Sequence, residues 1–327
     1  MSARLEEVAS ACPLCRGPSA LVIGRKDHRG APLVTVMCQG CGLARVEPLP
    51  SREQLAVFYR ERYRLEYKGV YEPKPHHVLR AARLARERLR RLAPQLAGVS
   101  RVLDIGCGGG ELLYLLRAAG RVTAGIEPNL RYGAYARDQL GLDVRIGLIE
   151  DQQFPAAWFG GITLFHVLEH LPDPVHTLAH IRPWLAPEGF LAIEVPNFAS
   201  TLDHPAHRFH RAHLFYFSAA TLELCALRAG FSAIHLKASA DGGNLYGLFR
   251  PAGEPVPPRR LPENYQALLA LEKSRSAAQY WLRRTTYTRA FRRLRGMLQE
   301  RREARRYAGR REILEALARQ TAEELSL

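Results

Sequence analysis

The sequence predicts an α/β fold: a doubly wound, mostly parallel sheet of seven strands, with a small cysteine-bearing module before it and a helical extension after it. From residue 101, short apolar segments alternate with helical stretches, which is the pattern of a parallel sheet covered by helices. The last two strands are joined by a glycine turn without a helix, so we expect them to pair antiparallel. Strands are expected at 101–105, 122–126, 144–146, 161–165, 190–195, 232–236 and 245–249, and helices at 111–119, 129–140, 174–185 and 218–229.

Length and composition narrow the class of protein. The chain has 327 residues, enough for one or two domains, and its 47% apolar content excludes global disorder. No run of about 18 apolar residues occurs, so no membrane span is expected. The first residues lack the apolar stretch of a secretory signal. These features favour a cytoplasmic protein.

The N-terminal module, at 1–50, carries four of the six cysteines in two Cys-x-x-Cys pairs: Cys12 with Cys15, and Cys38 with Cys41. Two such knuckles predict a zinc ribbon, in which four thiolates surround one structural Zn²⁺. The alternatives are unrelated thiols or two disulfides, and a cytoplasmic chain disfavours disulfides. The other two cysteines, Cys107 and Cys225, are expected to be small packing residues.

Two local structures are expected in and after this module. Segments 21–23 and 33–36 should form a hairpin between the knuckles. The segment 51–98 is expected to be a helical lid or connector, with a basic helix from 75 to 92 that stops at Pro94. Three tyrosines in it are candidates to close over a substrate: Tyr63, Tyr67 and Tyr71.

The first expected strand of the sheet runs into a glycine loop and then a helix. Glycines let the backbone approach a ligand closely, and the helix start supplies amide donors. Glu111 breaks the dinucleotide-binding spacing, and Asp104 at the strand end favours a cationic ligand over a pyrophosphate. A second acid, Glu127, ends the next strand, where a carboxylate can accept both hydroxyls of a ribose.

Three motifs in order resemble class I S-adenosylmethionine (SAM)-dependent methyltransferases over about 99–250. They are VLDIGCGGG at 102–110, GIEP at 125–128 and HVLEH at 166–170. The resemblance implies that the glycine loop holds the methionine end of SAM, that Glu127 binds the ribose, and that 147–151 flanks the adenine. His166 would face the methionine part or the substrate, while Glu169 and His170 are either functional or solvated. The implied cofactor residues are Asp104, Gly106, Cys107, Gly108, Gly110, Glu127, Pro128, Ile149, Glu150 and His166.

A histidine-rich segment at 198–217 follows the fifth strand, so it lies at the edge of the sheet where ligands bind. Its histidine spacing is irregular and its only nearby acid is Asp203, which disfavours a metal site. Methyl transfer needs alignment, plus a base when the acceptor is a hydroxyl or an acidic C–H, and a histidine suits that base at pH 7.

The stretch 210–218, the turn 241–244 and the four-cysteine module together resemble the deoxysugar C-methyltransferases. The catalytic histidine of that group aligns with His213. His210 stands where that group has a tyrosine, Ala212 stands where it has an acid, and its large C-terminal domain is replaced. We therefore expect His213 to be the base, with His210 and His166 assisting.

The expected reaction is methyl transfer from SAM to a polar small-molecule acceptor, such as a sugar, nucleotide-sugar or glycan, at oxygen or carbon. The main alternative is an rRNA or tRNA methyltransferase, and a second is a non-catalytic zinc-ribbon scaffold. Against RNA, the chain has Phe165-His-Val-Leu after the fourth strand, where adenine N-methyltransferases carry Asn/Asp-Pro-Pro-aromatic. Nucleic acid is therefore disfavoured as a partner.

The net charge of +15 is concentrated after a proline-rich linker at 251–264. The basic helical tail, 265–327, carries 12 arginines and two glutamates within 281–311. Apolar residues recur there near helical spacing, so one face is apolar. The tail is expected to pack on its own chain or form a homodimer; the alternatives are an anionic membrane surface, which suits peripheral attachment, and nucleic acid.

Overall fold

A computed structural model describes residues 6–63 and 72–325 of the chain. The backbone divides into two compact units, each assembled from segments that are distant in sequence. The first unit joins the residues up to 51 with 165–182 and 192–287, and the second joins 52–164 with 183–191 and 288–327. Tyr67 and Tyr71, two of the three proposed lid tyrosines, lie outside the described residues.

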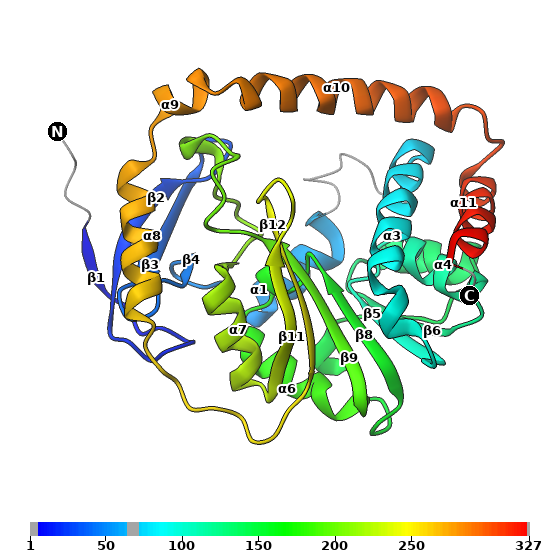
Figure 1. Ribbon diagram of the computed structural model, residues 1–327, viewed down its shortest axis with the longest axis horizontal. Coiled ribbons are helices and arrows are strands. Elements are labelled where there is room, and N and C mark those ends of the chain that lie inside the picture. Colours follow the sequence, from blue (N-terminus) through cyan, green and yellow to red (C-terminus); the bar gives the residue numbers. More distant parts are fainter. Residues whose placement is uncertain (1–5, 64–71, 326–327) are drawn as a thin grey trace. The chain divides into compact units, whose positions relative to one another are not determined.

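The seven-stranded sheet confirms the predicted fold class. Its strands are β5 (Arg101–Ile105), β6 (Val122–Glu127), β7 (Val144–Ile146), β8 (Phe159–Phe165), β9 (Leu185–Pro196), β11 (Phe231–Ala238) and β12 (Asn244–Pro251). The order is β11-β12-β9-β8-β5-β6-β7, a Rossmann-like arrangement (Figure 1). β5 pairs in parallel with both β6 and β8. Strands that follow β5 are therefore added first on its β6 side and then on its β8 side, so the strand order reverses at β5. Ligands of such sheets bind at the carboxyl ends of the strands beside that point.

The helices between these strands follow the predicted pattern. They are α4 (Glu111–Ala118), α5 (Leu130–Ala134), α6 (Pro174–Ile181) and α7 (Ala219–Arg228). Capping residues fix their starts: Asn129 accepts from the amide of Tyr132, and Ser218 and Thr221 form a capping box at α7. β11 and β12 pair antiparallel around the turn at 241–243, as expected.

The N-terminal module forms a second sheet, in the order β1-β2-β3-β4-β10. Its strands are β1 (Glu7–Ala9), β2 (Ser19–Lys26), β3 (Pro32–Cys38), β4 (Ala44–Val46) and β10 (Phe215–Tyr216). The β2–β3 hairpin was predicted. β10, which belongs to the histidine-rich segment, was not: Phe215 pairs with Arg45 and Tyr216 with Ala44. Part of the histidine-rich segment is therefore a strand of the cysteine module's sheet.

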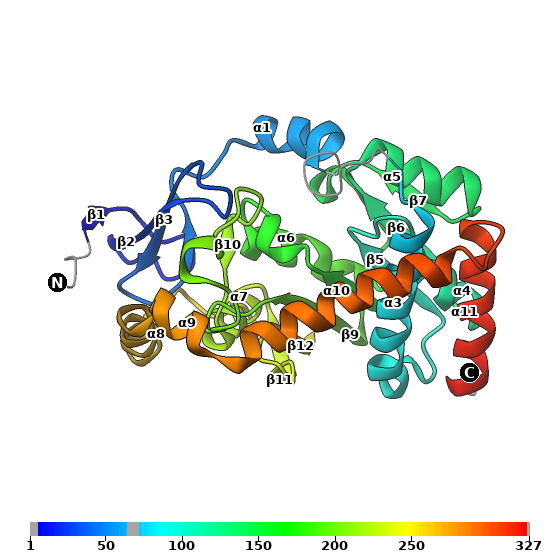
Figure 2. The same cartoon turned by 90° about the horizontal axis from the view of Figure 1, so that it is seen from above.

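The first tail helix, α8 (Pro262–Ser274), packs against this module. Leu268 is buried in one cluster with Met37 and Val46, and Tyr265 packs at its edge. The Asn264 amide donates to the carbonyl of Cys41 at 2.7 Å, which attaches the start of the helix to the second cysteine knuckle. Figures 1 and 2 show α8 beside the strands of this sheet.

One helix boundary was predicted wrongly. α3 (Pro75–Leu96) continues through Pro94 for a further half turn. Leu89, Leu92 and Leu96 lie on one face and are at most 1% exposed. Burying these leucines outweighs the hydrogen bond that the proline lacks, which is a small cost so close to the helix end.

The rest of the tail is helical, as predicted, but its helices differ in burial. They are α9 (Ala277–Leu282), α10 (Arg284–Ala304) and α11 (Arg310–Leu325). α11 packs on α3 and α4 through Ile313, Leu314 and Leu317 (Figures 1 and 2). Ion pairs from Arg80 to Glu300 and from Arg83 to Glu303 connect α3 with the end of α10. Upstream, α1 (Arg52–Val57) continues as a π-helical turn, Phe58–Arg62.

Candidate active site

The glycine loop after β5 carries a buried carboxyl group. Asp104 is 5% exposed, and the hydroxyl of Thr163 on β8 donates to its Oδ1 at 2.6 Å. Burial raises the pKa of the Asp104 carboxyl to about 7, although the Thr163 hydrogen bond offsets part of that effect. A cationic ligand would restore the ionised form, so this position suits the ammonium or sulfonium of SAM.

The loop itself is fixed by the acid that ends β6. Glu127 is 3% exposed, and its two oxygens accept from the backbone amides of Gly108 at 2.7 Å and Asn129 at 3.0 Å. Gly108 and Gly110 have φ values of +58° and +80°, a region that other residues rarely adopt. A Cβ at Gly110 would also lie 2.5 Å from Leu142. These contacts explain why glycines are required there.

The remaining predicted cofactor residues lie in the same unit, apart from His166. Cys107 is 6% exposed, and its sulfur would lie 2.8 Å from a Cβ at Gly125, so it also fills space against β6. Ile149 is buried and Glu150 partly buried in the short 3-10 helix at 149–151, and Pro128 directly follows β6. The neighbouring Asp151 pairs with Arg52 at 2.6 Å. Their roles toward SAM stay predictions.

The predicted catalytic histidines His210 and His213 lie in a row of four histidine rings. His210 stacks on His213 with ring centres 4.9 Å apart, and His213 meets His170 edge-on at the same distance. His28, from the hairpin turn of the cysteine module, stacks on the other face of His210 at 4.1 Å. Sequence reasoning missed His28, because its partner is 182 positions away in the chain.

The rings of His210 and His213 are predominantly neutral at pH 7. Burial lowers the pKa of His213 well below its usual value, and it lowers the pKa of His210 to about 4. His207, by contrast, is exposed, and its Nδ1 bonds to the His28 carbonyl oxygen at 2.8 Å, which supports the hairpin turn.

His166 and Glu169 form a second part of this cluster. His166 has a φ of +57°, an unusual conformation for a residue with a side chain, and its ring is 37% exposed. Its two ring nitrogens lie 3.4 Å from a Glu169 oxygen and 3.4 Å from a Glu194 oxygen. Glu169 and His170 are 1% and 7% exposed, so the alternative that they are solvated is wrong.

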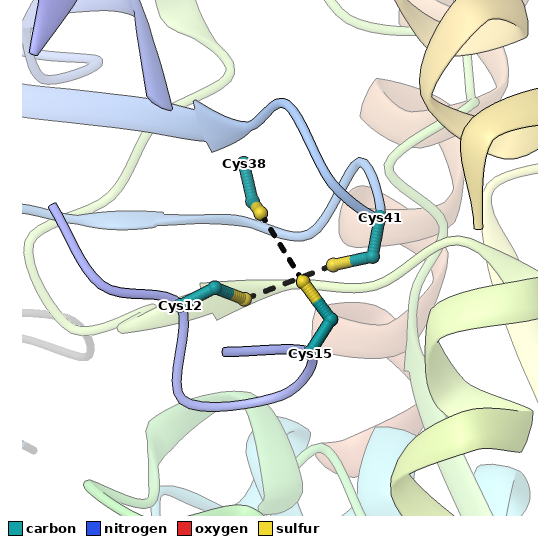
Figure 3. Close-up of side chains that lie close together, drawn as sticks. All are labelled: Cys12, Cys15, Cys38 and Cys41. Carbon is teal, nitrogen blue, oxygen red and sulfur yellow. Dashed lines mark hydrogen bonds between the residues drawn. The ribbon is translucent and has the colours of Figure 1, made fainter. Parts of the chain in front are cut away.

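The four paired cysteines converge as the knuckle spacing predicted (Figure 3). The sulfurs of Cys12 and Cys41 lie 3.7 Å apart and those of Cys15 and Cys38 lie 3.5 Å apart, which excludes disulfides in this arrangement. Four sulfurs at about 2.3 Å from a tetrahedral zinc would be about 3.8 Å apart. The cluster therefore has the dimensions of a Cys₄ zinc site. Cys38, in the second cysteine pair, is the last residue of β3. The opposite end of β3 follows the hairpin turn that carries His28.

The Rossmann-like sheet and the glycine loop after β5 are typical of the methyltransferase class, and comparison with known proteins points to the same class. A family model described as a methyltransferase domain matches residues 76–236. Over these residues, about half of the chain, the protein therefore resembles methyltransferases.

Among curated relatives, the chain is 34% identical over 134 residues to a ubiquinone biosynthesis O-methyltransferase of Actinobacillus pleuropneumoniae, covering 38% of this chain and 56% of that protein. It is 33% identical over 144 residues to the protein of the same name from Thiobacillus denitrificans, covering 42% and 58%. The chain thus spans little more than half the length of these relatives. Among solved structures, the CcbJ methyltransferase of Streptomyces caelestis matches with a TM-score of 0.43 and 14% identity, over 52% of this chain and 90% of that one.

Proposed function

We propose that this protein transfers the methyl group of SAM to a hydroxyl oxygen of a polar small molecule, with a sugar, nucleotide-sugar or glycan as the expected acceptor class. Asp104 and the glycine loop would hold the methionine end of SAM, and Glu127 its ribose. Among the relatives, the name O-methyltransferase favours oxygen over carbon as the acceptor atom.

The observation that carries this proposal is the pairing of β5 with β8. Ile105, the last residue before the glycine loop, pairs with Leu164, two positions before His166. In a parallel pair the carboxyl ends of both strands reach the same edge of the sheet. The carboxyl ends of β5 and β8, which precede the glycine loop and the HVLEH motif in the sequence, therefore lie side by side.

The histidines would supply the base. A hydroxyl attacks the methyl carbon in line with the sulfur, and its proton must leave as the new C–O bond forms. Imidazoles that are neutral at pH 7 can accept that proton, and His213 is the residue to which the sequence assigns this role. His166, with the exposed ring, is the assisting candidate.

The test is substitution of His213 with a matched surface control. His213→Ala is expected to lower turnover at least about 100-fold, the scale of a lost general base, with SAM binding by calorimetry unchanged. His176→Ala, on the exposed face of α6, should leave both unchanged. Acceptor panels of sugars, nucleotide-sugars and phenols would be scored by mass spectrometry. Methylation of tRNA or rRNA in place of any small molecule would contradict the proposal, and failure to bind SAM would support a scaffold.

We also propose that the four cysteines bind one structural Zn²⁺. The sulfur separations support this, as do amide hydrogen bonds to two of the sulfurs, from Gly17 to Cys15 and from Gly40 to Cys38. Such amides stabilise thiolate ligands. The carbonyls of Pro13 and Leu14 accept from Arg228 on α7, which attaches the first knuckle to that helix.

For the basic tail, we propose that α10 docks on an anionic membrane surface. Four of its apolar side chains recur at intervals of four, three and four residues and are 56–66% exposed: Tyr287, Phe291, Leu294 and Leu298. Arginines dominate the rest of the helix and match anionic headgroups. No helix in the described part of the chain is long and apolar enough to cross a membrane, so this attachment would be peripheral. A homodimer and nucleic acid are the competing partners.

A further inference from the structure

Glu169 is a buried carboxylate in an unusual state. Its side chain is 1% exposed, and within the described residues neither oxygen has a hydrogen-bond partner. Nδ1 of His166 lies 3.4 Å from Oε1 of Glu169 but lacks the alignment of a hydrogen bond. A buried carboxylate is strongly disfavoured unless positive charge compensates it.

The orientation of His170 sharpens the problem. Its Nδ1 lies 2.8 Å from the carbonyl oxygen of Ala212, which can only accept, so Nδ1 carries a proton. In the neutral ring, Nε2 then holds a lone pair, and that atom lies 3.8 Å from Oε1 of Glu169. A lone pair beside a carboxylate oxygen is repulsive unless Nε2 is protonated or a cation lies between the two atoms.

His213 completes the arrangement from the histidine-rich segment. One ring nitrogen of His213, one of His170 and one oxygen of Glu169 all lie within 4.8 Å of one another. The backbone reinforces this: the amide of Leu214 donates to the Glu169 carbonyl at 2.8 Å, which holds the two segments together. The sequence argument against a metal relied on Asp203 being the only acid near these histidines, and Glu169 removes that objection.

We propose that Glu169, His170 and His213 bind a divalent transition-metal ion through one carboxylate oxygen and two imidazole nitrogens. Ligand atoms about 2.1 Å from a tetrahedral ion would be about 3.4 Å apart, so atoms now within 4.8 Å of one another would have to close by up to about 1.4 Å, which side-chain rotation supplies. The contact of His170 with the Ala212 carbonyl is the supporting hydrogen bond that metal-binding histidines typically make through their other nitrogen.

Two histidines and one carboxylate leave coordination positions open for an oxygen ligand. If the proposed methyl transfer is correct, an acceptor hydroxyl bound there would lose its proton more readily. In that case His213 would act as a ligand in place of the base role proposed above, and His166, outside the ligand set, would accept the proton. The metal site itself does not depend on that reaction, since it rests on contacts within the first unit.

The experiment is a Mn²⁺ titration of the full chain followed by electron paramagnetic resonance. The protein is first dialysed against a weak chelator, which clears a nitrogen and oxygen site and leaves zinc in a thiolate cluster. Mn²⁺ binds poorly to thiolates, so the Cys₄ cluster does not compete. We expect one Mn²⁺ per chain, and at least tenfold weaker binding in both Glu169→Gln and His213→Asn. His176→Asn should bind as the unmodified protein does.

Zinc content and circular dichroism of each variant show whether it has folded. Glu169→Gln nearly preserves shape and volume, so it provides the decisive comparison if His213→Asn is misfolded. Absence of Mn²⁺ binding, or equal binding by folded Glu169→Gln, would overturn the inference and leave Glu169 paired with a protonated histidine. Mn²⁺ binding without methyl transfer to any acceptor would instead count against the proposed function alone.

Discussion

At the scale of single residues, the two acids beside the glycine loop have different surroundings. The sequence singled out both Asp104 and Glu127 as candidate SAM-binding residues, because each lies at or next to the end of a strand of a recognisable pattern. It did not predict that Glu127 accepts from the loop amide of Gly108, or that Asp104 is buried and accepts from the hydroxyl of Thr163. Such effects depend on neighbouring strands, and Thr163 is 59 positions from Asp104.

If Asp104 holds the methionine end of SAM as proposed, its burial should make SAM binding dependent on pH. With a pKa of about 7, this carboxyl is mostly protonated at pH 6 and mostly ionised at pH 8. A cationic ligand prefers the ionised form, so affinity should rise by about tenfold between these pH values, as the ionised fraction does. Calorimetry on the unmodified protein and on Asp104→Asn checks this: the variant should bind more weakly at pH 8 and without the pH dependence.

In the ligand-free protein, the raised pKa of Asp104 has the opposite effect on stability from its effect on SAM affinity. The folded state retains a proton that the unfolded chain releases above about pH 4, so stability falls as the pH rises from about 4 toward 7. Asp104→Asn should flatten this part of the denaturation profile. Asp138→Asn, an exposed position on the neighbouring helix, is the control. A flat profile of SAM affinity in the unmodified protein would contradict the assigned role of Asp104.

At the scale of elements, periodicity predicted where helices and strands form better than where they end. The seven strands of the larger sheet were found because each is a short apolar segment between turns. The end of α3 was missed because Pro94 is compatible with a last turn whose leucines are buried. The pairing of β10 with β4 was also missed, since a two-residue strand has no periodicity to recognise.

The tail shows what periodicity cannot separate. Apolar residues recur in both α10 and α11, yet those of α11 are buried against α3 and α4 while those of α10 are exposed. An amphipathic pattern reports that a face needs a partner and does not identify it. For α11 the partner is its own unit, so truncating the whole tail would disrupt packing, and α10 must be tested by substitution.

We expect the unmodified protein to cosediment with vesicles containing about one third phosphatidylserine. Replacing Phe291, Leu294 and Leu298 by serine should abolish cosedimentation, because the exposed apolar face supplies the insertion. Pure phosphatidylcholine vesicles should bind weakly, since arginines supply the attraction. The matched control is Val122→Ser with Ile234→Ser, two exposed apolar positions outside the tail. Membrane docking would be contradicted if the triple variant bound vesicles as well as the unmodified protein does. It would also be contradicted if the substitutions dissociated a dimer and did not affect vesicle binding.

At the scale of the whole molecule, the sequence predicted the parts but not their assembly. The cysteine cluster, the seven-stranded sheet and the helical extension were each recognisable from local patterns. What local motifs could not predict is that the cysteine module contributes both a strand partner for β10 and His28 to the histidine row. These contacts join positions near 30 and 45 to positions near 210, and only folding brings them together.

This assembly predicts that zinc affects turnover rather than cofactor binding. Losing the metal should loosen both knuckles and the hairpin between them, and with it the stacking of His28 on His210 and the β4–β10 pairing. Asp104, the glycine loop and Glu127 belong to the other unit. The hydrogen bonds from Thr163 to Asp104 and from Gly108 to Glu127 are made within that unit. Cys38→Ser should therefore lose zinc and most methyl transfer while it retains SAM affinity. Cys225→Ala, a buried cysteine outside the cluster, should keep zinc and activity. Full turnover by zinc-free protein would show that the module does not position the histidines.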